Sequence, residues 1–228
     1  MKPKKSATRV RRKTWYTIIA PKLFNNQVLG ESCVFDQRQL LGRKLRVNLM
    51  SLSGDPKKQN INIDFKITDL QGNKVKAEIV GYSMIASSIK RYVRRGATRI
   101  DETLICETSD NKKLKIKLFL LTRVHVKSSR EKQLRKLLIE SIVASVKKYT
   151  YEKFFDAIIT YKLQRSVRQT LNKISPLRVC EVRSVTIASE KEAAKKLIKQ
   201  IKVKPATDEK EKSVAENEKP SEASAEKN

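Results

Sequence analysis

The segment INIDFKITDLQGNKVKAEI, residues 61–79, decides the fold class. Its first part carries an apolar side chain at every second position, namely Ile61, Ile63, Phe65 and Ile67. Strict alternation of this kind predicts a half-buried β-strand. Residues 71–73, with the sequence QGN, interrupt the alternation, and residues 75–79 resume it. The segment is therefore predicted to form a β-hairpin.

The flanking residues repeat this pattern and then change to a helical one. Residues 45–49 alternate as a further strand, and residues 98–107 and 113–126 predict a second hairpin around a polar turn at 109–111. Between the hairpins, residues 84–95 have helical spacing, and Gly96 is placed to end that helix.

The second half of the chain begins with helices. Ser128 and Glu131 have the spacing of a capping box, and apolar residues of helical period follow to Tyr149. A further helix is predicted from Thr150, with a break before Leu163 and an end at Pro176. Residues 177–187 alternate as a strand, and a short helix is predicted from Ser189 to Lys202.

These patterns predict an α+β fold, in which an antiparallel sheet or partly closed β-barrel is packed with helices. Three parts are expected: a basic RNA-binding arm at 1–13, a folded domain at 14–203 and a disordered tail of mixed charge at 204–228. The tail has five lysines against seven acidic residues and almost no apolar side chains to bury, which is typical of disorder.

The charge of the chain indicates a polyanionic partner. It has 51 Lys and Arg against 24 Asp and Glu, a net charge of +27. A compact body with this excess repels itself unless phosphates neutralise it, so nucleic acid is the leading candidate. An anionic membrane is disfavoured, because apolar runs such as residues 118–121 are much shorter than a spanning helix.

The basic residues gather in the arm, along residues 113–127 and around two helices. On the strand from Lys113, one face is mostly cationic, with Phe119 and Leu121 between the cations, and the other face is mostly apolar. This pattern favours phosphate contact over a merely solvated face. Arg91, Arg94 and Arg95 would share one side of the first helix. The predicted RNA-binding residues are Lys4, Lys5, Arg9, Arg11, Arg12, Lys13, Arg43, Arg91, Arg94, Arg95, Arg99, Lys113, Lys115, Lys117, Arg123, Lys127, Arg130 and Arg135.

Catalysis has little support in the sequence. His125 is the only histidine, and Asp101 and Glu102 adjoin in a predicted strand, so their side chains point to opposite faces. No glycine-rich nucleotide-binding loop occurs, and the three cysteines are too far apart to suggest a disulfide framework or a zinc site. We expect no enzymatic activity, no cofactor and no metal.

Several motifs in a fixed order resemble one protein family. They begin with K-x-W-Y-x-I-x-A-P-x-x-F-N at 13–25 and L-x-G-R at 40–43, and continue with F-K-I-T-D-L-Q-G at 65–72, G-Y-S-M at 81–84, V-R-R-x-x-x-R-I-D at 93–101, Ser128 with Arg130 and Arg135, I-S-P-L at 174–177 and V-R-S-V at 182–185. The series is similar to the small-ribosomal-subunit proteins of the archaeal and eukaryotic S-one-e type, also called S-three-A.

The resemblance implies a structural constituent of a 30S-type subunit in the cytoplasm. It places the protein on the platform, near the 3′ end of the ribosomal RNA and the messenger exit channel. The implied partners are small-subunit ribosomal RNA and neighbouring ribosomal proteins, with messenger RNA as an additional candidate and no membrane. Among the predicted contacts, the matching motifs include Lys13, Arg43, Arg94, Arg95, Arg99, Arg130 and Arg135. The alternative is a free-standing RNA-binding protein or RNA chaperone that acts off the ribosome.

The opening motif joins the basic arm to the folded body. Trp15, Tyr16, Ile18 and Ile19 are expected to dock on that body and to fix where the arm begins. A fully buried tryptophan would contribute about 3–5 kcal/mol to stability. The alternative is that Trp15 stacks on RNA, in which case its removal would leave the fold intact.

Overall fold

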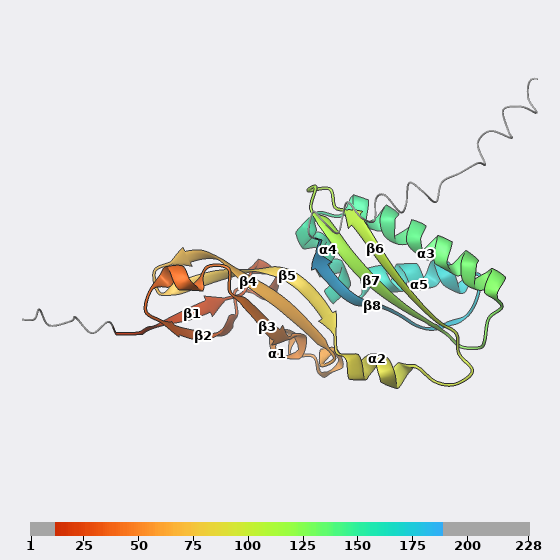
Figure 1. Cartoon of the computed structure of the whole chain (residues 1–228), viewed down its shortest axis with the longest axis horizontal. Helices are drawn as coiled ribbons and strands as arrows, with labels where there is room; N and C mark the ends of the chain where they lie inside the picture. Colours follow the sequence, from red (N-terminus) through yellow and green to blue (C-terminus); the bar gives the residue numbers. More distant parts are fainter. Residues whose placement is uncertain (1–11, 189–228) are drawn as a thin grey trace, which may run out of the picture. The chain divides into compact units, whose positions relative to one another are not determined.

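The segment that decides the fold class forms the predicted hairpin. In the computed structural model, which describes residues 12–188, β4 (Ile61–Gln71) pairs with β5 (Lys74–Met84) along its whole length (Figure 1). Ile61, Ile63, Phe65 and Ile67 are all buried. Gly72 makes the turn with a φ of 57°, a conformation that costs glycine little.

The other strands extend this hairpin into an eight-stranded sheet. They are β1 (Thr14–Ile19), β2 (Val28–Val34), β3 (Lys44–Asn48), β6 (Arg99–Glu107), β7 (Lys113–Thr122) and β8 (Leu177–Ile187). The order is β2-β1-β5-β8-β7-β6, and β3 and β4 branch from β5. Among the described strands, β1 and β5 are parallel and the other pairs are antiparallel.

β5 connects the two halves of the sheet. Its beginning pairs with β1, and Gly81–Ser83 near its end pair with β8. At Gly81, a β-carbon would lie 3.2 Å from Oδ2 of Asp64 and 3.4 Å from the carbonyl oxygen of Val185. The absence of a side chain therefore lets β4 and β8 approach β5 from both sides.

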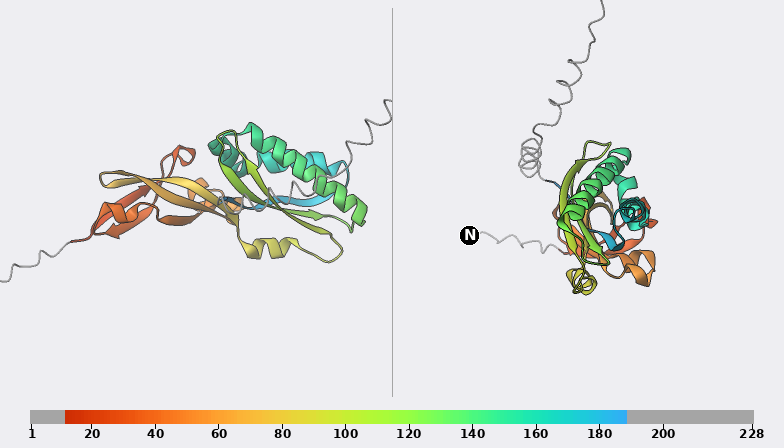
Figure 2. Two further views of the ribbon diagram at one scale, coloured as in Figure 1. Left: turned by 45° about the horizontal axis from the view of Figure 1, so that its top comes forward. Right: turned by 90° about the vertical axis from the view of Figure 1, so that its right-hand side faces the viewer.

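Five α-helices and three short 3-10 helices complete the described residues. The α-helices are α1 (Leu49–Ser53), α2 (Ala86–Tyr92), α3 (Ser128–Lys148), α4 (Tyr151–Ile159) and α5 (Lys162–Asn172). The 3-10 helices are η1 (Lys22–Phe24), η2 (Gln37–Leu40) and η3 (Pro56–Lys58). α3 packs on β6, and α5 packs on β8 and on α3 and α4 (Figure 2). The prediction of an α+β fold with a multi-stranded sheet and packed helices is confirmed in this form, with an open sheet.

The helical pattern of the second half is confirmed, although its caps differ from the prediction. The buried face of α3 is formed by Leu134, Leu138, Ile142 and Val146. Ser128 and Glu131 form no capping box, because α3 already begins at Ser128 with Lys127 as the capping residue and no side-chain cap. The break before α5 falls at Tyr161, whose φ is 59°.

The helix predicted for residues 84–95 is shorter than expected. Met84 ends β5, and α2 stops at Tyr92 because Val93 is extended, with φ −72° and ψ 120°. Gly96 lies in a later turn with a φ of 78° instead of capping the helix. The helix predicted from Ser189, the tail from 204 and most of the basic arm lie outside the described residues.

Candidate nucleic-acid interface

Two loops at one end of the β6–β7 hairpin are held together by hydrogen bonds. Residues 93–98 lead into β6, and residues 123–127 lead from β7 into α3. The backbone nitrogen of Thr98 donates to Oγ1 of Thr122 over 3.0 Å, and that of Thr122 donates to the carbonyl oxygen of Thr98 over 3.1 Å. The second loop also reaches the turn before β8, since the nitrogen of Arg123 donates to the carbonyl oxygen of Pro176.

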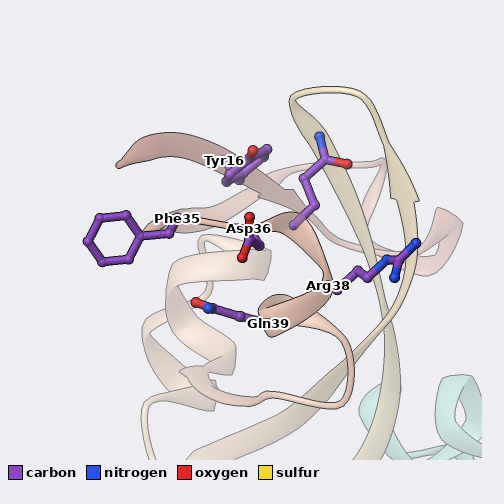
Figure 3. Close-up of a pocket in the computed structure, with 6 residues that line it drawn as sticks. Tyr16, Phe35, Asp36, Arg38 and Gln39 are labelled. Carbon is purple, nitrogen blue, oxygen red and sulfur yellow. The ribbon is translucent and has the colours of Figure 1, made fainter. Parts of the chain in front are cut away.

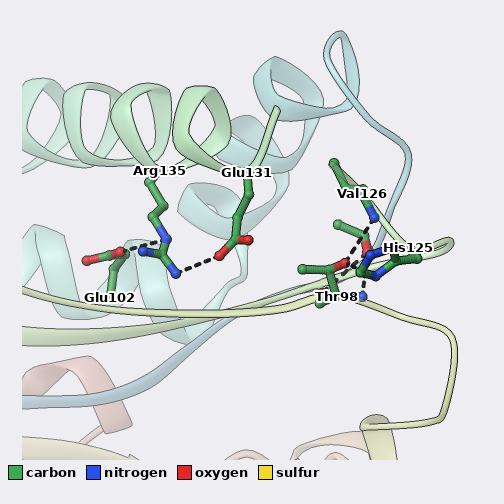
Figure 4. A network of polar contacts seen from close by, with 7 residues as sticks. Thr98, Glu102, His125, Val126, Glu131 and Arg135 are labelled. Carbon is green, nitrogen blue, oxygen red and sulfur yellow. Dashed lines mark hydrogen bonds and ion pairs between the residues drawn. The ribbon is translucent and has the colours of Figure 1, made fainter. Parts of the chain in front are cut away.

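The side chain of Thr98 completes this connection (Figure 4). Its Oγ1 accepts a hydrogen bond from the backbone nitrogen of Val126 over 3.0 Å and lies 3.2 Å from Nδ1 of His125. Oγ1 of Thr122 donates to the carbonyl oxygen of Val124 over 2.7 Å. The hydrogen bonds of Thr98 and Thr122 thus fix the shape of the two loops, and His125 has a structural contact there.

The paired loops and the elements they join carry a group of exposed cations, which we call the loop cluster. Its members are Arg94, Arg95, Arg99, Arg123, Lys127 and Arg130. These residues come from three separate predicted groups: the first helix, the β7 row and the start of α3. Folding brings them to one end of the sheet, because the hydrogen bonds of Thr98 and Thr122 join their loops. The arrangement offers several donors to adjacent phosphates.

The predicted basic row along β7 is interrupted. Lys117 is exposed, but the next two residues of the same parity, Phe119 and Leu121, are completely buried. They form a small cluster with Ile89 of α2, which covers this face of the sheet. The cationic face therefore extends only from Lys113 to Lys117, and Arg123 and Lys127 belong to the loop beyond the strand.

Several predicted RNA contacts already have acidic partners. Arg135 lies with Nε 3.3 Å from Glu102 and with Nη2 2.6 Å from Glu131, so it connects α3 to β6 (Figure 4). Arg99 binds Asp101 and also lies over the Phe119 ring, 5.5 Å from its centroid. Lys113 is 3.4 Å from Glu107. A phosphate would have to compete with these carboxylates.

The grouping of Arg91, Arg94 and Arg95 on one helical face is wrong. Arg91 lies in α2, where Nη2 donates to Oδ1 of Asn60 over 3.0 Å. Arg94 and Arg95 follow the end of the helix and belong to the loop. The extended conformation of Val93 separates them from Arg91.

The remaining predicted contacts lie in the first half of the chain. Arg43 precedes β3 and is exposed, with Nη1 3.4 Å from Oγ of Ser32. Arg12 and Lys13 precede β1 and are exposed. Lys4, Lys5, Arg9 and Arg11 lie outside the described residues. These cations are separated in the chain and in the sheet order from the loop cluster, so the predicted set does not form one site.

The prediction that Trp15 docks on the folded body is wrong. Tyr16 and Ile18 are 6% and 1% exposed, whereas Trp15 is 65% exposed. The physical reason is the alternation of β1, which directs neighbouring side chains to opposite faces. The period of two was readable in the sequence, but the apolar character of Trp15 led to its assignment to the core. Phe35, which no motif singled out, is also exposed.

One buried carboxyl lies on the covered face of the sheet. Glu181 of β8 pairs with Phe119 of β7, and its Oε2 has no hydrogen-bond partner among the described residues. Burial raises the pKa of Glu181 to about 7, an effect that the nearby Arg168 opposes. Tyr82 and Tyr161 are the neighbouring hydroxyl groups, and the charge of Glu181 helps to raise the pKa of each.

The described part of the chain has neither a membrane-spanning helix nor a cluster of metal ligands. Between residues 12 and 188, no helix combines the length and the apolar character needed to cross a bilayer. Over the same range, no three His, Cys, Asp or Glu side chains are grouped in a way that could hold a metal ion. Cys33, Cys106 and Cys180 are free thiols, and burial raises the pKa of Cys106 to about 11.

Comparison with known proteins gives a consistent result. The sequence profile of the Ribosomal S3Ae family matches residues 1–191. The small ribosomal subunit protein eS1 of Halorubrum lacusprofundi is 30% identical over 189 residues, which cover 80% of this chain and 88% of the relative. The proteins of the same name from Sulfurisphaera tokodaii and Methanothermobacter thermautotrophicus are 31% and 30% identical over 170 residues, covering 75% of this chain and 88% and 87% of those relatives.

The family profile includes the whole stretch in which the motifs were found, from Lys13 to Val185, and the three archaeal relatives are matched over 87–88% of their own length. The resemblance seen in the sequence is thereby confirmed, as are the archaeal character of the chain and the absence of an enzymatic role. The chain belongs to the ribosomal S3Ae family, whose members are small-subunit ribosomal proteins of the cytoplasm and not enzymes.

Proposed function

We propose that this chain stabilises the folded RNA of the small ribosomal subunit, using the loop cluster as its main phosphate-binding surface. The observation that carries the proposal is the pair of loops fixed by Thr98 and Thr122. Because these loops are held in one conformation, their cations are presented without the full entropic cost of ordering two flexible segments. The surface would recognise RNA shape and phosphates more than base sequence.

The proposed position within the subunit is the one that the family resemblance implies. We propose that the protein lies on the platform, near the 3′ end of the ribosomal RNA and the messenger exit channel. Neighbouring ribosomal proteins are its proposed protein partners, and messenger RNA is an additional candidate. The names of the archaeal relatives support the small subunit, and the net charge of +27 supports an RNA-rich surrounding.

Sedimentation tests this function. The full chain, expressed with an affinity tag in an archaeal host, is expected to travel with small subunits through a low-magnesium gradient. A variant with Arg123, Lys127 and Arg130 replaced by alanine should move partly to the unbound fraction. If the unaltered chain stays at the top of the gradient, the proposal is wrong. RNA binding by that unbound fraction would then favour the free-standing RNA-binding protein or chaperone.

A further inference from the structure

The outward face of the β1–β2 hairpin carries two large aromatic side chains that residues 12–188 leave exposed. Trp15 is 65% exposed and Phe35 is 45% exposed. Trp15 pairs with Cys33 across the two strands, so Phe35 is the diagonal neighbour of Trp15 just beyond the end of β2. Diagonal neighbours on one face are about 7–8 Å apart, which is within reach of aromatic rings. We call Trp15 and Phe35 the aromatic pair.

Cations surround the aromatic pair on the same face. Lys13 lies two residues before Trp15, and its Nζ is 5.2 Å from the centroid of the Phe35 ring. On the other side of β1, Lys74 and Lys76 of β5 pair with Thr17 and Ile19 and are exposed. Lys13 and Lys74 thus lie nearer the rings than Lys76, which pairs with Ile19 further along β1. On the same face, Glu31 lies opposite Thr17, level with Lys74, and Asp69 lies opposite Lys76.

Phe35 also borders a hollow with polar walls (Figure 3). The hollow has a volume of about 730 Å³ and is lined by Tyr16, Phe35, Asp36, Gln37, Arg38 and Gln39. In Figure 3 the Phe35 ring points away from the other labelled side chains, toward the outside of the hairpin. The ring is therefore open to solvent at the edge of the hollow.

This combination fits single-stranded RNA better than a protein partner. Proteins that bind single strands combine cations along the backbone with aromatic rings on which bases stack, and each stacked base contributes about 1–3 kcal/mol. The centres of protein–protein interfaces are instead depleted in lysine. A double helix hides the faces of its bases, so exposed rings would gain little from it.

We propose that Trp15 and Phe35 stack on unpaired bases of a single-stranded RNA segment, while Lys13, Lys74 and Lys76 bind its phosphates. The inference rests on the proposed RNA-binding function and names a second surface with a different RNA specificity. The loop cluster would recognise folded RNA through its phosphates. The aromatic pair would recognise bases that are free to stack.

Tryptophan fluorescence tests the proposal directly, because Trp15 is the only tryptophan of the chain. The full chain is titrated with oligouridine of about 12 nucleotides and, separately, with duplex RNA of the same length. Stacking should quench the fluorescence on saturation with oligouridine, whereas the duplex should bind with little quenching. Each emission change is compared with filter binding in the same buffer.

Variants separate stacking from charge. Phe35→Ala and Trp15→Ala should each lower the affinity for oligouridine by about tenfold and change the affinity for the duplex by less than about twofold. Ile187→Ala, which removes another exposed apolar side chain at the end of β8, is the matched control and should change neither affinity. Thermal unfolding monitored by circular dichroism checks that each variant is folded.

The possible outcomes distinguish this inference from the proposed function. Oligouridine binding without quenching, with unchanged affinity in both aromatic variants, would overturn the stacking site and leave RNA binding intact. Failure to bind either RNA would instead count against the proposed function itself. Quenching that appears only when other small-subunit proteins are added would overturn the inference and assign the aromatic pair to a protein contact.

Discussion

The β6–β7 and β1–β2 hairpins both carry cations and aromatic rings, but they arrange them differently. On β6–β7, Arg99 is held by Asp101 and by the Phe119 ring, and Phe119 itself is buried beneath α2. On β1–β2, Lys13 lies over Phe35, and both that ring and Trp15 remain exposed. The first hairpin uses these groups for its own packing, while the second presents them to solvent.

The two hairpins differ in how many of their cations are free to bind a phosphate, and the net charge of a segment does not predict that number. Lys113, Arg99 and Arg135 all belong to basic stretches, yet each has an acidic partner within 3.4 Å. The other cations of the loop cluster, namely Arg94, Arg95, Arg123, Lys127 and Arg130, and those around the aromatic pair are better candidates. The difference is set by which strands and helices fold against each stretch.

The largest expected effect is that of Phe119→Ala, which tests whether α2 covers the aromatic ring of the β6–β7 hairpin. This ring is 0% exposed, although its strand position has the same parity as Lys117. Phe119→Ala should lower the free energy of unfolding by about 3–5 kcal/mol, because a large cavity would open beneath α2. Urea denaturation of the full chain measures the change.

The matched control is Lys117→Ala, two residues earlier on the same face. Its side chain is exposed, so the free energy of unfolding should change by less than about 0.5 kcal/mol. Equal effects of the two substitutions would mean that α2 does not cover this face. In that case the two hairpins would differ less than the structure indicates.

The regular elements could be predicted because each leaves a periodic signature. The β4–β5 hairpin, the buried stripe of α3 from Leu134 to Val146 and the break at Tyr161 all follow from local patterns. The covering of Phe119 could not be predicted in this way. It depends on the contact with Ile89, thirty positions earlier in the sequence. The alternation of β7 predicts that its two faces differ, but not that a distant helix covers one of them.

The covered face also contains a group whose titration should change stability. Glu181, opposite Phe119, has a pKa raised to about 7 by burial, from 4.5 when exposed. Its raised pKa favours the protonated form in the folded state. Stability from this residue is therefore complete below about pH 4.5 and is lost as the pH rises toward 7, by about 2–3 kcal/mol.

Denaturation curves between pH 4.5 and 7.5 measure this loss. In Glu181→Gln, which cannot ionise, the decrease in unfolding free energy across this range should be smaller by about the same amount. The exposed Glu31→Gln on β2 is the control and should keep the profile of the unaltered chain. An unchanged profile in Glu181→Gln would show that this carboxyl is not desolvated by the covered face.

The loop cluster offers a test at the level of RNA binding. Replacing Arg123, Lys127 and Arg130 by alanine should reduce the slope of log affinity against log salt by about two to three, since each phosphate contact contributes nearly one. The control replaces Lys148, Lys153 and Lys173, which are equally exposed but belong to other helix ends. Filter binding to small-subunit RNA at several salt concentrations gives both slopes, and similar slopes would argue against a localised phosphate surface.

The candidate site could be predicted only in part, because it too depends on contacts between distant segments of the chain. The loop cluster joins residues of three separate segments through the hydroxyl groups of Thr98 and Thr122, which carry no signal of their own in the sequence. Trp15 was wrongly assigned to the core because its side chain is large and apolar. Its position in β1 instead directs it to the exposed face. Residue type alone predicts burial poorly at a strand that has one open face.

The smallest expected effect concerns the competition between Asp101 and a phosphate for Arg99. The two side chains are each 41% exposed, so their ion pair contributes at most about 1 kcal/mol. Asp101→Asn should release the guanidinium and raise the affinity for small-subunit RNA by about two- to fourfold at low salt. Asp55→Asn adds the same charge by disrupting the pair with Lys58 on η3, in which the Asp55 side chain is 59% exposed, and should leave the affinity nearly unchanged. Equal gains in the two variants would mean that Arg99 is held for the fold alone, since only a phosphate within its reach makes Asp101 a competitor.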